Sequence, residues 1–231
     1  MDDDKQNGNV LFLILIAVAL FAALSYAVTQ SSRGGGNADS EVRALTASKL
    51  DQIIANINVG IQRLHLKGCA YEDISFYSTL YGTPSDFDNA NTPVAGGDFS
   101  CHLFNPEGGG ISWFGEDMSD EICTAAGCGS VTITFSGDFS IDGVGTSDAE
   151  LIMIIDGFEE NLCDLYNERI GITGDPPVDT ADLTSSDYFV GSFEDSSPKV
   201  IGDDASEFSG QYTGCYNEGA YLNFYSVLVA R

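Results

Sequence analysis

The hydrophobic residues of this chain are concentrated in one stretch close to the N-terminus. Residues 10–28 contain no charged side chain, and the first polar side chains in the run are Ser25 and Tyr26. As a helix rising ~1.5 Å per residue, this run is roughly 28 Å long, close to the ~30 Å hydrocarbon thickness of a bilayer. A soluble core helix of this length would have a polar face. The pattern therefore predicts a helix over 9–33 that spans a membrane or forms the core of a filament.

A second, amphipathic helix is predicted after a run of three glycines. The glycines break the first helix and form a hinge, and Asp39 or Ser40 can cap the next helix. Apolar residues then recur at three-to-four-residue spacing, and the pattern ends at the glycine after Lys67. We expect the hinge and the amphipathic helix to occupy 34–68 and the apolar stripe to pack on a sheet formed by the remaining chain. The hinge glycines are Gly34, Gly35 and Gly36.

The remaining residues, 69–231, have the pattern of a glycine-rich β domain with many turns. Residues 131–141 predict a β-hairpin with its turn at 136–138. Short strands are predicted at 188–193 and 199–201.

Two longer elements complete this domain. Residues 147–170 predict a continuous helix that opens with a capping box, and the alternative is a strand and a shorter helix separated at Asp156 and Gly157. The end of the chain, 221–231, is rich in β-forming residues and predicts a terminal strand in the sheet. The fold class is therefore α+β, with an N-terminal transmembrane helix that continues after the hinge into an amphipathic helix packed on an antiparallel sheet.

The charge of the chain restricts its partners. Nine Lys and Arg residues stand against 35 Asp and Glu residues, which gives a formal net charge of −26. Such a surface repels phosphate backbones, so the sequence excludes nucleic acid as a partner. The acidic balance favours solubility and salt tolerance, with divalent cation binding as the alternative.

All cysteines lie after the apolar helix. An even number of cysteines in a segment that follows a membrane helix predicts disulfides in an exported domain, with three bridges expected. Only Cys123 and Cys128 indicate a local bridge by their spacing. A zinc site is the alternative, but the adjacent Cys101 and His102 cannot easily bind one metal. The disulfide candidates are Cys69, Cys101, Cys123, Cys128, Cys163 and Cys215.

The sequence offers no catalytic constellation. The two histidines, His65 and His102, do not belong to a nucleophile motif, and we assign no catalytic residue and no cofactor. The segment with Asp86, Asp88 and Asn89 has oxygen ligands at alternate positions, as a calcium loop has. The next alternate position is Ala90, which offers no side-chain oxygen. The segment is a weak calcium candidate, with an Asx-rich turn as the default interpretation.

The layout of the first 68 residues resembles that of the type IV pilins and of the pseudopilins of type II secretion. The resemblance rests on an apolar helix that begins directly after Gly8 and continues into an amphipathic helix and a disulfide-bearing β domain. It implies an 8-residue leader, 1–8, that a peptidase removes after Gly8 to leave a methylated Asn9. The chain departs from the family in its acidic leader and in Leu13, where most members carry a glutamate.

The resemblance implies a structural subunit that lies in the inner membrane as a single-pass protein and then assembles, with secretion or pilus machinery, into a periplasmic or cell-surface filament. The positions expected to carry assembly are Val10, Leu13, Ala19, Ala23 and Val28. The alternative is a membrane-anchored extracytoplasmic domain that binds a ligand or a partner without polymerising. No motif supports a membrane-tethered enzyme.

Overall fold

The structure, a computed structural model, describes residues 7–31, 35–80, 83–115, 122, 131–181, 187–219 and 221–231, and the side chains of 7–11, 27–31 and 35–39 lie outside the description. The chain divides into two compact units, Met1–Leu45 and Thr46–Arg231. We call the second the globular unit. Sequence analysis expected residues 9–33 to span a membrane. In the parts of the chain described, no helix is long and apolar enough to do so.

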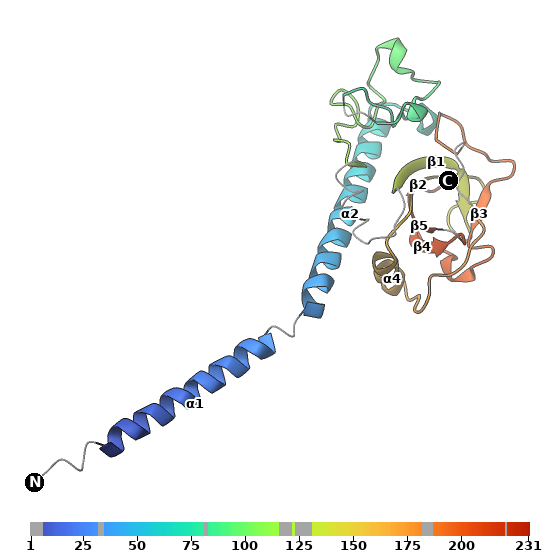
Figure 1. Cartoon of the computed structure of the whole chain (residues 1–231). Helices are drawn as coiled ribbons and strands as arrows, with labels where there is room; N and C mark the ends of the chain where they lie inside the picture. The colour runs from blue at the N-terminus through green and yellow to red at the C-terminus, as the bar shows by residue number, and fades with distance from the viewer. Residues whose placement is uncertain are drawn as a thin grey trace, which may run out of the picture. The chain divides into compact units, whose positions relative to one another are not determined.

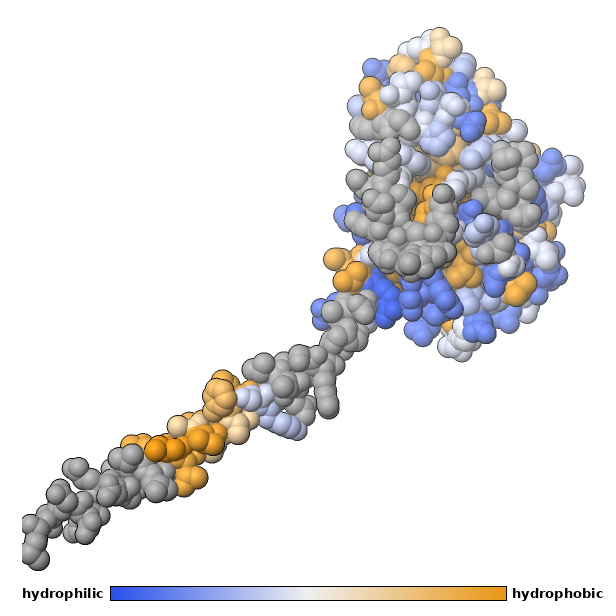
Figure 2. Space-filling view, in the orientation of Figure 1, coloured by the Kyte–Doolittle hydropathy of each residue, from blue (hydrophilic) through white to orange (hydrophobic). Residues whose placement is uncertain are grey.

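The first unit contains helix α1, Asn7–Ser31, and the start of helix α2, Gly35–Leu66 (Figure 1). Of the helix predicted over 9–33, residues 9–31 are helical, and 32–33 lie outside the described residues. Figure 2 shows that most of the described part of α1 consists of hydrophobic residues. Its large apolar side chains are exposed, with 73% of Phe21 and 66% of Leu20 accessible to solvent.

The start of the second helix differs from the prediction. The helix α2 begins at Gly35, ahead of the expected caps Asp39 and Ser40, so Gly35 and Gly36 lie in its first turn and do not interrupt helical structure. Glycine lowers helix stability by only about 1 kcal/mol, so a long helix can include it at one end. Gly34 lies outside the described residues. The predicted end is confirmed, because α2 stops at Leu66 and Gly68 adopts a φ of +97°.

A curled five-stranded sheet with the strand order β3-β1-β2-β5-β4 forms the centre of the globular unit (Figure 1). The pairs β1–β2, β2–β5 and β5–β4 are antiparallel, whereas β3 runs parallel to β1. The expectation of an antiparallel sheet is therefore wrong at this edge. The strands are β1 Thr132–Ile141, β2 Glu150–Asp156, β3 Lys199–Ile201, β4 Thr213–Asn217 and β5 Leu222–Val229.

The predicted hairpin within 131–141 is one continuous strand, β1. The register between β1 and β2 shifts between Ser136 and Phe139, where a bulge replaces the expected turn. Before the bulge, Ile133 and Phe135 face one side of the sheet, and after it Phe139 faces the other. A bulge has this effect because one extra residue reverses the side-chain alternation.

The continuous helix predicted over 147–170 is also wrong, and the alternative is confirmed. The strand β2 ends at Asp156, and helix α4, Glu160–Arg169, follows after Gly157. The carboxylate of Glu159 accepts a hydrogen bond from the backbone N–H of Leu162 at 3.0 Å and so caps this helix.

The predictions for the remaining short elements are confirmed only in part. The C-terminal strand is confirmed as β5, and the strand at 199–201 is confirmed as β3. The described part of 188–193 forms no strand. Short 3-10 helices occur at Tyr71–Asp73, Ser85–Phe87, Val94–Gly96 and Ser206–Phe208.

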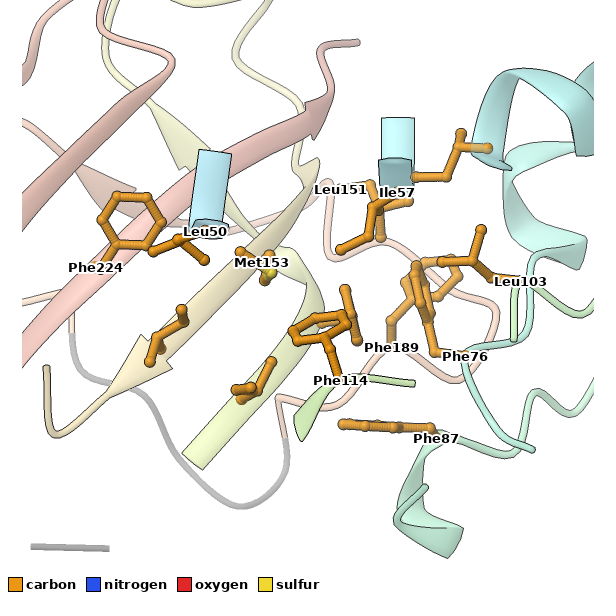
Figure 3. Packing of buried hydrophobic residues seen from close by; sticks show 14 of the residues in the cluster. Leu50, Ile57, Phe76, Phe87, Leu103, Phe114, Leu151, Met153, Phe189 and Phe224 are labelled. Carbon is orange, nitrogen blue, oxygen red and sulfur yellow. The ribbon is translucent and has the colours of Figure 1, made fainter. Parts of the chain in front are cut away.

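Two hydrophobic cores lie on opposite faces of the sheet. In the first core, Leu50 and Ile57 of α2 pack with Met153 of β2 and with aromatic side chains of several loops (Figure 3). Helix α4 contributes Leu162 to the same core. The second core lies between the other face and the segments around 170–208, and its largest members are Phe139, Phe208, Tyr216 and Tyr225. A sheet buried on both faces explains the continuous apolar sequence of β2.

Candidate assembly helix and its globular anchor

Helix α1 is the candidate assembly element. It contains no charged residue. The predicted assembly positions Leu13, Ala19 and Ala23 are exposed, with 60% of Leu13 accessible. Since exposed apolar surface costs roughly 25 cal/mol per Å² relative to burial, a helix of this composition is stabilised when another apolar surface covers it.

The ends of α1 hold the other predicted positions. Gly8, Asn9 and Val10 lie in its first turn, and Val28 lies in its last. The leader cleavage expected between Gly8 and Asn9 would therefore fall at the N-terminal end of this helix. The side chains of these residues lie outside the description.

A hydrogen-bonded junction ties α2 to α4 within the globular unit. The Tyr166 hydroxyl donates to the carboxylate of Asp51 at 2.8 Å and also lies 3.0 Å from the carbonyl oxygen of Ala47. Arg169 adds an ion pair with Asp51 at 2.9 Å, and its guanidinium lies over the Tyr166 ring. Burial and, less strongly, the adjacent Asp51 carboxylate raise the pKa of Tyr166, so the phenol stays protonated as a donor. The junction fixes the part of α2 that belongs to the globular unit to α4.

The last turn of α2 is held by the glycine-rich loop at 108–110. Arg63 donates to the carbonyl oxygen of Gly109 at 2.5 Å, and Lys67 donates to that of Gly108 at 2.8 Å. A Cβ on Gly109 would lie 2.6 Å from the carbonyl oxygen of Leu103, so the loop needs glycine at this position. Two cations near the helix C-terminus also complement its dipole.

Disulfides fasten two places in the globular unit. Cys69, after the end of α2, is bonded to Cys101, and Cys163 of α4 is bonded to Cys215 of β4. Two of the three bridges expected from the sequence are thus present. Cys123 and Cys128 lie outside the described residues.

The segment around 86–89, the weak calcium candidate, forms a hydrogen-bonded turn. Asp88 accepts from the backbone N–H of Val94 at 3.0 Å, and Asn89 accepts from that of Asn91 at 2.8 Å. The Asn89 amide also donates to two backbone carbonyls, whereas Asp86 is exposed. These bonds match the Asx-rich turn that sequence analysis gave as the default. Across the described segments, no group of three or more His, Cys, Asp or Glu residues is placed to hold a metal.

Sequence reasoning missed three buried polar residues. Asn167 was part of the helix predicted over 147–170, Glu150 was read as a member of its capping box, and His102 was considered as a metal ligand and as a member of a nucleophile motif. All three are at most 2% exposed. The sequence signal available was a polar residue within an apolar run, and it does not reveal which partner satisfies the residue.

Comparisons with known proteins identify no relative. No family model matches the chain, and neither a curated protein nor a solved structure is significantly similar to it.

Proposed function

We propose that this protein is a structural subunit that self-associates through α1 into a pilus-like or pseudopilus filament. The observation that carries the proposal is the uncharged helix α1, whose described apolar side chains are exposed and which lies in a different compact unit from the sheet. Burying one Leu or Phe side chain contributes about 1.5 to 3 kcal/mol, so packing α1 helices of several copies against one another provides a large driving force.

The small residues of α1 support a helix–helix interface. Ala19 and Ala23 are four residues apart and therefore lie on the same face of the helix. Small side chains allow two helices to approach closely, as in helix pairs that form within membranes. In the proposal, each chain is held in the inner membrane through α1 before assembly, and the acidic globular units lie on the outside of the filament afterwards.

The layout shared with the type IV pilins adds a processing step to the proposal. A peptidase would cut between Gly8 and Asn9 and free the N-terminal end of α1. This step separates the filament proposal from the anchored binding domain, because an anchor needs no cleavage.

The mature N-terminus tests this step. The full chain is produced in a cell that contains a prepilin peptidase, and the membrane-associated protein is analysed by intact mass and N-terminal sequencing. We expect Asn9 at the N-terminus, and we expect Gly8→Val to block cleavage while the control Asn7→Ser leaves it intact. A wild-type chain that retains Met1 would favour the anchored domain over the filament subunit.

A further inference from the structure

A buried histidine lies at the centre of the loops that cover the C-terminal half of α2. These loops, which we call the loop cap, are the described residues within 69–115. Ser75 pairs with His102 as an isolated bridge, and Leu103 donates its N–H to the carbonyl oxygen of Ser75 at 2.8 Å. The cap fits closely on α2, because a Cβ on Gly60 would lie 2.6 Å from the Leu103 side chain.

Both ring nitrogens of His102 face backbone carbonyl oxygens. Nδ1 lies 3.1 Å from the carbonyl oxygen of Tyr77, and Nε2 lies 2.9 Å from that of Thr92. The residue is 0% exposed. A carbonyl oxygen only accepts hydrogen bonds, and a neutral imidazole has one N–H and one acceptor nitrogen. The neutral ring can therefore satisfy one contact and leaves two acceptors facing each other at the second.

We propose that His102 is an imidazolium clamp that makes the loop cap responsive to pH. In the charged form, one N–H donates to Tyr77 and the other to Thr92, and the two segments are joined. When water takes one ring proton, one of the two hydrogen bonds is lost and the corresponding segment is released from the ring. The cap is thus tighter in acid and loosens as the pH rises.

Charged groups of both signs lie around the cap. Asp98 precedes the turn that carries His102. Hydrogen bonds from Ser100 lower the pKa of the Asp98 carboxyl. On the side of α2, Arg63 and Lys67 are hydrogen-bonded to carbonyl oxygens of the 107–109 loop.

Two further neighbours of His102, Phe99 and the disulfide-bonded Cys101, carry no titratable group. The ring of Phe99 meets the imidazole edge-on with centroids 5.2 Å apart, and the adjacent Cys101 is bonded to Cys69. Because that disulfide stays closed when His102 loses its proton, it limits the opening to a local event. The first core, which includes Phe76 and Phe104 from the same loops, borders the region that would loosen.

Nuclear magnetic resonance of the full chain tests the clamp. The ¹⁵N shifts of the His102 ring distinguish the imidazolium from each neutral tautomer between about pH 5 and about pH 8. Amide exchange, corrected for its intrinsic pH dependence, reports the opening of the cap at Leu103 relative to Met153 in β2. We expect the imidazolium in acid and roughly tenfold less protection at Leu103 once the ring loses a proton, as for one charge-assisted hydrogen bond.

Variants separate the clamp from general packing. His102→Gln should remove the pH dependence of protection at Leu103, while His65→Gln, at the exposed histidine on α2, should keep it. A His102 ring that is a single neutral tautomer throughout this pH range, in a protein whose cap stays protected, would overturn the proposal. A ring that loses a proton while Leu103 and Met153 lose protection together would also overturn the proposal, because the whole unit would then open and not the cap alone. The ring measurement uses the wild-type protein and so decides even if His102→Gln does not fold.

Discussion

Asn167 of α4 forms two hydrogen bonds with the backbone of Cys215 in β4. Its Nδ2 donates to the carbonyl oxygen at 2.7 Å, and its Oδ1 accepts from the N–H at 2.9 Å. The side chain thus pairs with β4 as a further strand would, at the edge of the sheet opposite β3. Covering backbone groups at a sheet edge protects it from pairing with another chain.

Replacing Asn167 by Ala should therefore destabilise the globular unit. The change leaves one buried N–H and one buried carbonyl group without partners, and we expect a loss of about 2 to 4 kcal/mol in the free energy of unfolding. Urea unfolding followed by circular dichroism measures the loss. Asn161→Ala, at an exposed position of the same helix, is the matched control and should change stability little. Equal stability of the two variants would show that the edge does not need Asn167.

Glu150 gives the stability of the protein a dependence on pH. Its side chain is fully buried, and one carboxylate oxygen accepts from the N–H of Ile141 at 3.1 Å. Burial raises its pKa from 4.5 to about 7, partly offset by this hydrogen bond. The folded state therefore holds a proton that the unfolded chain releases at lower pH. The contribution of Glu150 to stability falls as pH rises from 4.5 to about 7, by up to about 3 kcal/mol, and then levels off.

Glu150→Gln removes this titration and keeps an acceptor for Ile141. We expect the stability advantage of the variant over wild type to grow as pH rises through this window, measured by urea unfolding at several pH values. Glu207→Gln removes an exposed carboxyl and controls for the change in net charge. A difference between Glu150→Gln and wild type that is the same at all pH values would contradict the assignment.

Serine at both Cys163 and Cys215 should lower stability strongly. The bridge closes a loop of 52 residues, for which the loss of loop-closure entropy corresponds to about 4 kcal/mol. Calorimetry of the wild-type protein and the double variant measures the change, and wild-type protein treated with reductant is the control. A double variant that melts with the wild type would show that Asn167 and the core hold α4 without the disulfide.

The sequence predicted correctly those elements whose apolar residues follow a spacing that fits either a helix or a strand but not both. The amphipathic stripe of α2 and the β-forming run of β5 were both recognised, because each pattern suits only one periodicity. The run from Leu151 to Ile155 was assigned to a helix because a capping box precedes it and apolar residues follow at helical spacing. A strand buried on both faces has the same appearance, and the second core that buries Ile152 and Ile154 was not visible from the sequence.

Glycine misled the prediction at two places for different reasons. Gly137 suggested a turn, but a Cβ there would lie 2.8 Å from Phe189 and 2.8 Å from the carbonyl oxygen of Ser192, so the strand needs glycine for close approach of a distant loop. Gly35 suggested the end of a helix and lies at the start of one. The partners of His102, Asn167 and Glu150 are set by tertiary contacts, which local patterns do not encode.

The net charge predicts that salt promotes assembly. With −26 per chain, neighbouring globular units repel one another when α1 helices pack together. Salt at 0.1 M screens charges that lie more than about 10 Å apart, so sedimentable assemblies of the purified, processed chain should increase from low salt to this concentration. Assembly that decreases with salt would mean that attraction between charges, and not apolar contact, holds the copies together.

The most direct measurement of the central claim compares assembly of the wild-type chain processed at Gly8 with that of two equally processed variants that each add one negative charge. Ala23→Asp places the charge in α1, where burial in an apolar helix bundle is costly, and Ala95→Asp places it on the exposed surface of the loop cap. Sedimentation and electron microscopy detect filaments, and unfolding of the globular unit checks that both variants are intact. We predict filaments for wild type and Ala95→Asp and none for Ala23→Asp. Equal assembly of the two variants, or a wild-type chain that stays monomeric under all salt conditions, would contradict assembly through α1.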